Sequence, residues 1–274
     1  MKQIRLDQLK EMLDVLEEAF KELDVDFYMI GAIAKEYWYR RGNKKTRHTK
    51  DVDFAVLVLC RAKYDAVRER LKDYHFTDTR ENAFVMISPQ GVQVDLLPFG
   101  DIAIDETVTL TGQGMTSIRV DGFMEVYQKG TAPAEMETGH QFKTATLPGI
   151  VLLKLIAYDD RPEKRQKDAG DIAGIIQHFF DLQADLIYEY YHDLFGDTQP
   201  DRNLKEIAAI VIGREMKKMC DRNQGLKNRL LSILKTQIDQ GHTSLFVQQM
   251  VKETASNVKE MMEWLIYIQQ GISE

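Results

Sequence analysis

The sequence predicts an α+β fold, with a mixed β-sheet and flanking helices over residues 1–146 and a C-terminal helical domain over residues 147–274. Short apolar runs of strand length alternate with amphipathic helical patterns in the first part, and only helical periodicity remains after Thr146. A chain of 274 residues is long enough for one large domain or two modest ones. The change of pattern favours two.

The N-terminal part is expected to run helix, strand, helix, strand, helix and then a hairpin. The ranges that fit these patterns are 4–23, 27–30, 32–40, 51–59, 62–74, and 84–88 paired with 92–97. Gly31 ends the first strand, and residues 89–91 form the tight turn of the hairpin. Residues 101–115 are interpreted as loop with short edge strands. Further strands are expected at 118–120, 125–127 and 141–146.

The C-terminal part is expected to contain helices only. Their ranges are 149–159, 163–180, 184–194, 203–219, 226–240 and 244–270. Pro148 is tolerated in the first turn of a helix, and Pro162 separates the first two helices. The Leu, Ile and Met repeats of the later helices are interpreted as core packing.

The composition is that of a globular protein with an acidic balance. Hydrophobic residues make up 44% and charged residues 29%, with a net charge of -7. This charge argues against a generally basic surface that coats nucleic acid, although one basic patch is dense. The patch consists of Arg40, Arg41, Lys44, Lys45, Arg47, His48 and Lys50. It is either a solvated loop or a guide for an NTP or an RNA end.

The chain shows no sign of a membrane segment or of an oxidising compartment. No apolar stretch approaches the length that crosses a bilayer, and the first helix is too charged for a signal peptide. Cys60 and Cys220 match no metal or redox spacing. We therefore expect a cytoplasmic protein with no membrane partner.

Two carboxylates stand one residue apart in an otherwise apolar strand. Asp51 and Asp53 project from one face of that strand, and Val52 and Phe54 from the other. Carboxylates this close repel each other unless a cation lies between them, and a divalent metal is the usual cation. Asp95 is a third acid in an apolar strand, where an unpaired carboxylate would be costly.

Three acids on strands, beside a strand that turns through Gly31 into a helix, suit metal-dependent phosphoryl or nucleotidyl transfer. The helix start presents free N–H groups and a positive dipole end to a phosphate. Asp51, Asp53 and Asp95 would hold Mg²⁺ or Mn²⁺, and Asp95 would also orient or deprotonate the incoming hydroxyl. The alternative is structural, with Asp51 capping a turn and the other two acids paired with the basic patch.

In the helix expected over 149–159, Lys154 is the only cation in an otherwise apolar surface. Arg161 follows seven residues later and falls over the same face of that helix. Two stacked cations would suit a triphosphate. Asp168 and Asp171, one turn apart, would orient these cations or the nucleotide. The alternatives are a lysine whose amine reaches water and ordinary ion pairs on a helix surface.

The order of strand, Gly-small turn, helix, Asp-hydrophobic-Asp and later strand Asp resembles the nucleotidyltransferase superfamily of DNA polymerase beta, poly(A) polymerases and kanamycin-type antibiotic nucleotidyltransferases. Residues 31–34 followed by 47–54 are most similar to the AbiEii-type toxin branch. The downstream motif of 153–157, Arg161, and 167–168 with Asp171 resembles a helical motif of the same branch. The resemblance covers roughly residues 25–180. Ala32 departs from the family's usual second Gly or Ser and lacks a hydroxyl.

The resemblance implies that residues 1–146 form a nucleotidyltransferase domain that transfers an NMP from an NTP to a hydroxyl acceptor, with tRNA or another RNA 3′ end as acceptor. It also implies a toxin with an antitoxin partner. The nucleotide-binding residues that it implies are Gly31, Ala32, Lys50, Lys154, Arg161 and Asp168. An antibiotic or a protein is the other class of acceptor. A non-catalytic nucleotide- or partner-binding module on the same fold is the other class of function.

Overall fold

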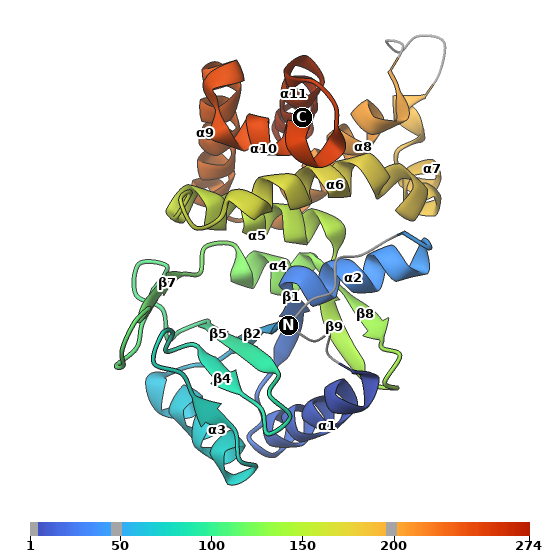
Figure 1. Ribbon diagram of the computed structural model, residues 1–274. Coiled ribbons are helices and arrows are strands. Elements are labelled where there is room, and N and C mark those ends of the chain that lie inside the picture. Colours follow the sequence, from blue (N-terminus) through green and yellow to red (C-terminus); the bar gives the residue numbers. More distant parts are fainter. Residues whose placement is uncertain (1–4, 45–50, 196–201) are drawn as a thin grey trace. The chain divides into compact units, whose positions relative to one another are not determined.

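The computed structural model describes residues 5–44, 51–195 and 202–274 and confirms the predicted α+β class. The chain forms two compact units (Figure 1). The first, here called the sheet unit, comprises Met1–Tyr127 and Thr131–Thr146. The second, the helical unit, comprises Gln128–Gly130 and Leu147–Glu274.

The sheet unit is built on a mixed sheet. Among the described residues its strand order is β3-β4-β5-β2-β1-β9-β8. β2 lies parallel to β5 and antiparallel to β1, and β1 lies parallel to β9. A separate hairpin pairs β6 with β7. The strand bounds are β1 Phe27–Ile30, β2 Asp51–Leu57, β3 Thr77–Asp78, β4 Val85–Ile87, β5 Gln93–Phe99, β6 Thr107–Thr109, β7 Ser117–Arg119, β8 Thr131–Glu135 and β9 Gln141–Ala145.

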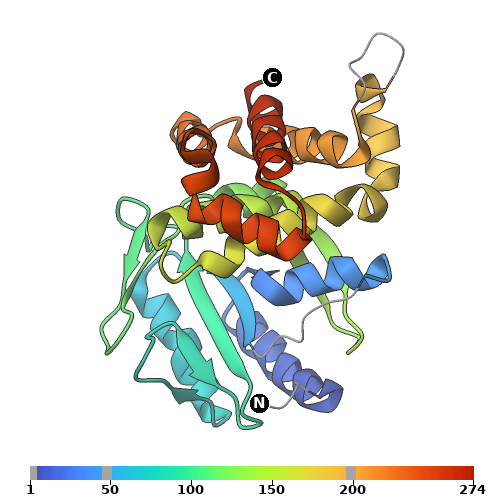
Figure 2. The same ribbon diagram turned by 45° about the horizontal axis from the view of Figure 1, so that its top comes forward.

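Helices cover both faces of this sheet (Figures 1 and 2). Their bounds are α1 Leu6–Glu22, α2 Gly31–Arg41, α3 Arg61–Asp73 and α4 Phe123–Lys129. α1 buries its apolar side, and the Phe20 ring lies 6.3 Å from that of Phe54 in β2, measured between centroids. Because side chains alternate along a strand, Asp53 points to the opposite face, where α2 begins.

β3, α4 and β8 differ from the sequence prediction, and β3 is a two-residue strand that was not expected. The strand expected at 125–127 is wrong, because this segment belongs to α4. Gly122, at φ +82°, turns the chain, and the Val126 N–H donates to the Gly122 carbonyl at 2.9 Å, which closes a helical turn. β8, which contains Pro133, was not predicted. The structure places β8 at an edge of the sheet, where proline is tolerated.

The helical unit is a bundle. Its α-helices are α5 Leu147–Asp160, α6 Gln166–Leu182, α7 Ala184–Tyr190, α8 Leu204–Cys220, α9 Gln224–Gln240, α10 Leu245–Thr254 and α11 Val258–Ser273. Short 3₁₀ turns follow α7, at His192–Leu194, and α9, at Gly241–Thr243. None of the described helices is both long enough and apolar enough to span a bilayer.

The single helix expected over 244–270 is wrong, because the chain breaks between α10 and α11. Ala255 adopts the left-handed conformation at φ +52°, and the Asn257 side chain caps α11 by accepting from the Glu260 N–H at 3.0 Å. The helix expected over 184–194 likewise ends earlier, at Tyr190.

Candidate functional site

The acidic residues of β2 and β5 lie side by side in the sheet unit. Asp53 is the direct cross-strand partner of Asp95, and Asp51 is the partner of Gln93. All four side chains project from one face, because each pair is two residues from the next along its strand. The four residues are half-buried, whereas Val52 and Val94 between them are fully buried in the core. The register therefore brings two predicted metal ligands, Asp53 and Asp95, together.

Gly31 sits against Asp53. A Cβ atom built on residue 31 would lie 2.2 Å from Asp53 Oδ2, so no larger residue fits without moving the carboxylate. Gly31 also adopts φ +65°, which glycine tolerates without steric cost. α2 starts at this residue, and Ile30 at its N-cap has no polar side-chain atom to accept from the first N–H groups. The positive end of α2 thus faces Asp53, which favours an anion there.

Gln93 is a site residue that the sequence interpretation missed. Its Nε2 donates to Asp95 Oδ1 at 2.9 Å, which fixes one oxygen of the carboxylate. The sequence could have indicated Gln93, because it stands two residues before Asp95 and residues at this spacing share one face of a strand. Polar residues at this spacing from a candidate ligand are candidates themselves.

The carboxylates of Asp53 and Asp95 are ligands of the kind that Mg²⁺ prefers. In nucleotide enzymes Mg²⁺ is usually bound by one or two carboxylates, with water and substrate phosphates completing the octahedron. Asp53 and Asp95 provide two in-register carboxylates at a helix start that favours phosphate, so these residues fit the ion. In the part of the chain that the structure describes, no group of three or more His, Cys, Asp or Glu side chains is arranged to hold a metal.

The helical unit contains a charged triad between α5 and α6. Lys154 Nζ donates to Asp168 Oδ1 at 2.6 Å and to Asp171 Oδ2 at 2.8 Å. The three side chains are between 9% and 18% exposed, and Asp168 Oδ2 is buried with no hydrogen-bond partner among the described residues. Burial by itself would lower the pKa of Lys154, but the two carboxylates outweigh it and raise the pKa. Lys154 therefore keeps its proton and its positive charge at neutral pH.

Other predicted residues have less specific positions. Arg161 donates from Nε to Asp160 at 2.9 Å, at the end of α5, and Ala32 occupies the second position of α2. In the basic patch, Arg40 pairs with Glu36 at 2.6 Å and also with Glu137. Four other members of the patch, Lys45, Arg47, His48 and Lys50, lie outside the described residues. The acids belong to the sheet unit, and Lys154, Arg161 and Asp168 belong to the helical unit.

Comparisons with known proteins give structural similarities only. No family model and no curated protein matches the sequence. The solution structure of the antibiotic-resistance factor ANT(2'')-Ia is 12% identical, with a TM-score of 0.37, and the match covers 69% of this chain and 100% of that one. A crystal structure of ANT(2'')-Ia in complex with adenylyl-2''-tobramycin is 12% identical, with a TM-score of 0.39, and covers 66% and 91%. Similarity at this level assigns no family.

Proposed function

We propose that this protein is a metal-dependent nucleotidyltransferase that moves an NMP from an NTP to a hydroxyl acceptor and releases pyrophosphate. The observation that carries the proposal is the register of β2 and β5, which sets Asp53 opposite Asp95 beside the start of α2. Paired carboxylates next to the first N–H groups of a helix suit a metal-bound triphosphate. Gly31 admits no side chain at this point unless the Asp53 carboxylate moves.

The chain's own residues have distinct roles in this proposal. Asp53 and Asp95 would hold the metal, and Asp51, on the same face of β2, would be the third ligand that the sequence predicts. The first N–H groups of α2, at Gly31 and Ala32, bind phosphate oxygens. Asp95 takes the proton of the acceptor hydroxyl. The hydroxyl oxygen bonds to the α-phosphorus of the NTP as the bond from that phosphorus to pyrophosphate breaks. When bound, Mg²⁺ or Mn²⁺ offsets the charge that develops on the leaving group.

We also propose that Lys154, Arg161, Asp168 and Lys50 bind the nucleotide, as the resemblance of their motifs implies. Lys154 is held by two carboxylates, so a phosphate must compete with Asp168 or Asp171 to reach it. The two ion pairs argue that Asp168 and Asp171 orient Lys154, and the Arg161 side chain is 21% exposed against 13% for Lys154. This division of roles is testable by separate variants at Lys154 and Arg161.

The acceptor that we propose is an RNA 3′ end, with tRNA included. This assignment is supported by the resemblance of residues 47–54 to the AbiEii-type toxin motif, which also supports a toxin with an antitoxin partner. An antibiotic hydroxyl and a protein hydroxyl are the competing acceptors. Each is a separate arm of the same experiment.

The test is transfer of label from each α-labelled NTP in Mg²⁺ or Mn²⁺, with total RNA, an aminoglycoside or a protein extract as acceptor. We expect label on RNA with the wild type, and a loss of about 100-fold or more with Asp53→Asn or Asp95→Asn. Asp24→Asn is the matched control, because Asp24 is exposed and at φ +48°, a conformation that Asn accepts. Its rate should equal that of the wild type.

Three results would overturn parts of the proposal. Label on no acceptor, with NTP binding detected by calorimetry, would favour the binding module. Label on the aminoglycoside or on protein alone would replace the RNA acceptor. Undiminished transfer by folded Asp53→Asn and Asp95→Asn variants would remove these residues from the site.

A further inference from the structure

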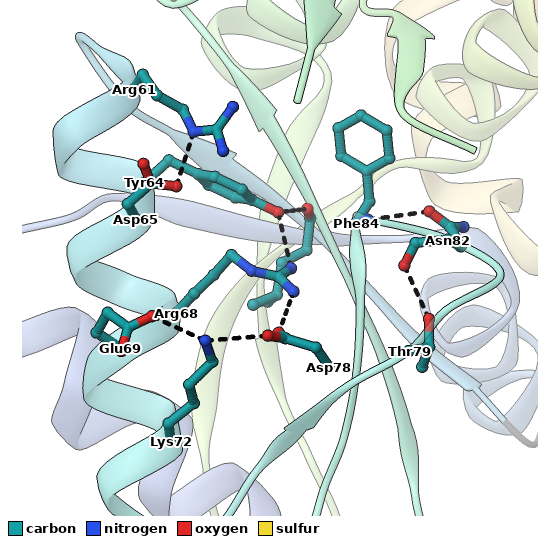
Figure 3. A network of polar contacts seen from close by, with 11 residues as sticks. Arg61, Tyr64, Asp65, Arg68, Glu69, Lys72, Asp78, Thr79, Asn82 and Phe84 are labelled. Carbon is teal, nitrogen blue, oxygen red and sulfur yellow. Dashed lines mark hydrogen bonds and ion pairs between the residues drawn. The ribbon is translucent and has the colours of Figure 1, made fainter. Parts of the chain in front are cut away.

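The backbone hydrogen bonding between β4 and β5 is incomplete at Leu96, the residue after Asp95. In an antiparallel hydrogen-bonded pair, two residues exchange both N–H···O bonds. At the pair next to Asp95, the Leu96 N–H donates to the Phe84 carbonyl at 2.9 Å, but the return bond is replaced. The Phe84 N–H donates instead to Asn82 Oδ1 at 2.9 Å, and the Leu96 carbonyl accepts from the Tyr64 hydroxyl at 2.8 Å (Figure 3).

Tyr64 therefore takes the place of a main-chain donor at the end of this strand pair. Its side chain comes from α3 and is fully buried, so its hydroxyl is the group that satisfies the Leu96 carbonyl in a site shielded from water. Burial raises the pKa of Tyr64 to about 12, which keeps the hydroxyl protonated and able to donate at neutral pH.

Charged residues of α3 and β3 form a network that contacts the Tyr64 hydroxyl through Arg68 (Figure 3). Arg68 donates from Nη1 to the Tyr64 hydroxyl oxygen at 3.4 Å and forms an ion pair with Asp78 of β3. Lys72 also pairs with Asp78, at 3.0 Å, and with Glu69, at 2.8 Å. The Arg68 side chain is only 11% exposed, so its position is well defined by these contacts. α3 and β3 together fix the Tyr64 hydroxyl against β5.

We propose that Tyr64 is a positioning residue of the site, whose hydroxyl fixes the β5 backbone at Leu96 and thereby holds Asp95 opposite Asp53. The inference rests on the proposed transferase function. Asp95 precedes Leu96, so a shift of the Leu96 peptide changes where the Asp95 carboxylate points. Without the hydroxyl, the Leu96 carbonyl loses the donor that holds it in a site shielded from water. Misplacement of a reacting group by about 1 Å costs on the order of 100-fold in rate.

The test compares Tyr64→Phe with Tyr28→Phe. Tyr28 is the matched control, because it is also fully buried in the sheet unit and its hydroxyl donates to a backbone carbonyl, that of Phe123, at 2.9 Å. Both variants lose one buried hydroxyl–carbonyl bond, so we expect similar decreases in Tm. We expect Tyr64→Phe alone to lower kcat, by about 10- to 100-fold, with a nearly unchanged KM for the NTP.

A second readout does not depend on turnover. Calorimetric titration of each protein with Mn²⁺ should show weaker binding by Tyr64→Phe, because Asp95 is one of the proposed ligands, and unchanged binding by Tyr28→Phe. If Tyr64→Phe does not fold, Arg68→Met is the substitute, because it keeps the Tyr64 hydroxyl and removes the guanidinium that donates to it. This variant should lower kcat in the same direction by a smaller factor.

The outcomes separate the two claims. If the wild type transfers no label to any acceptor, the proposed function fails and the inference fails with it. If the wild type is active, and Tyr64→Phe or its substitute Arg68→Met retains the kcat and the Mn²⁺ affinity of the Tyr28→Phe control, the positioning role is overturned while the proposed function stands.

Discussion

Gly31 lies so close to Asp53 that a Cβ atom at residue 31 would be 2.2 Å from Asp53 Oδ2. The Gly31→Ala variant must therefore displace the carboxylate that we assign to the metal. We expect transfer activity to fall by about 100-fold or more. The measurement is the initial rate of label transfer at saturating NTP, with the melting temperature recorded for each protein.

Gly91→Ala is the control for backbone strain in this experiment. Gly91 has a similar positive φ, +80°, but no atom lies within 4 Å of a Cβ built there. Both substitutions place alanine in the left-handed region at a cost of about 1–2 kcal/mol, so their stabilities should fall by related amounts. Activity should fall only for Gly31→Ala. Equal activity of the two variants would show that Asp53 need not keep its position.

A second prediction concerns the triad between α5 and α6. Lys154→Met removes the cation that contacts both Asp168 and Asp171, and breaking a partly buried pair in this way costs about 3 kcal/mol. We expect this loss in the free energy of unfolding, measured with urea. The double variant Lys154→Met/Asp168→Asn should recover much of it, because one of the two carboxylates that lost Lys154 is replaced by a neutral amide. No loss in the single variant would mean that the triad contributes nothing to stability.

The pH dependence of the same triad has a definite sign. The carboxylates raise the pKa of Lys154 above its usual value of 10.5, so the folded protein holds this proton more tightly than the unfolded chain. The stabilisation is therefore fully present below pH 10.5 and is lost as the pH rises through the higher folded-state value. The difference in unfolding free energy between wild type and Lys154→Met should stay constant between about pH 7 and pH 10 and then shrink.

The parts of the fold and of the candidate site that could be predicted are those decided by interactions between residues close in sequence. Alternation along a strand is local, so the sequence correctly predicted that Asp51 and Asp53 share a face, and that β2 and β5 are strands. The pairing of Asp53 with Asp95 is not local, because it is set by the register of two strands separated by α3 and a hairpin. Nothing in the period of either strand specifies that register.

The missed elements follow the same logic. The segment 125–127 is too short for its apolar pattern to distinguish strand from helix, and the turn at Gly122 decides in favour of α4. The pattern over 244–270 is continuous, so the break at Ala255 is invisible in it. The Tyr64 hydroxyl is likewise undetectable in the sequence, since its partner is a backbone carbonyl that every residue carries.

The crossing of α8 and α11 gives a prediction that tests the packing of the helical unit. A Cβ at Gly213 would lie 2.2 Å from the Ile268 carbonyl oxygen, and one at Gly271 would lie 2.2 Å from that of Ile210. These neighbours are backbone atoms, so the helices must separate to admit a methyl group. We expect Gly213→Ala to lower the free energy of unfolding by about 3 kcal/mol, measured with urea.

Gly225→Ala is the matched control for that measurement, since Gly225 is in the first turn of α9 and a Cβ there would meet only Asn223 Oδ1, at 3.4 Å. Alanine is the better helix former, so this variant should be neutral or slightly more stable. A Gly213→Ala variant as stable as Gly225→Ala would mean that the two helices do not approach at these glycines. If Gly213→Ala is destabilised, the two glycines exist to allow the backbones to touch, and the pairing of α8 with α11 is a fixed part of the fold.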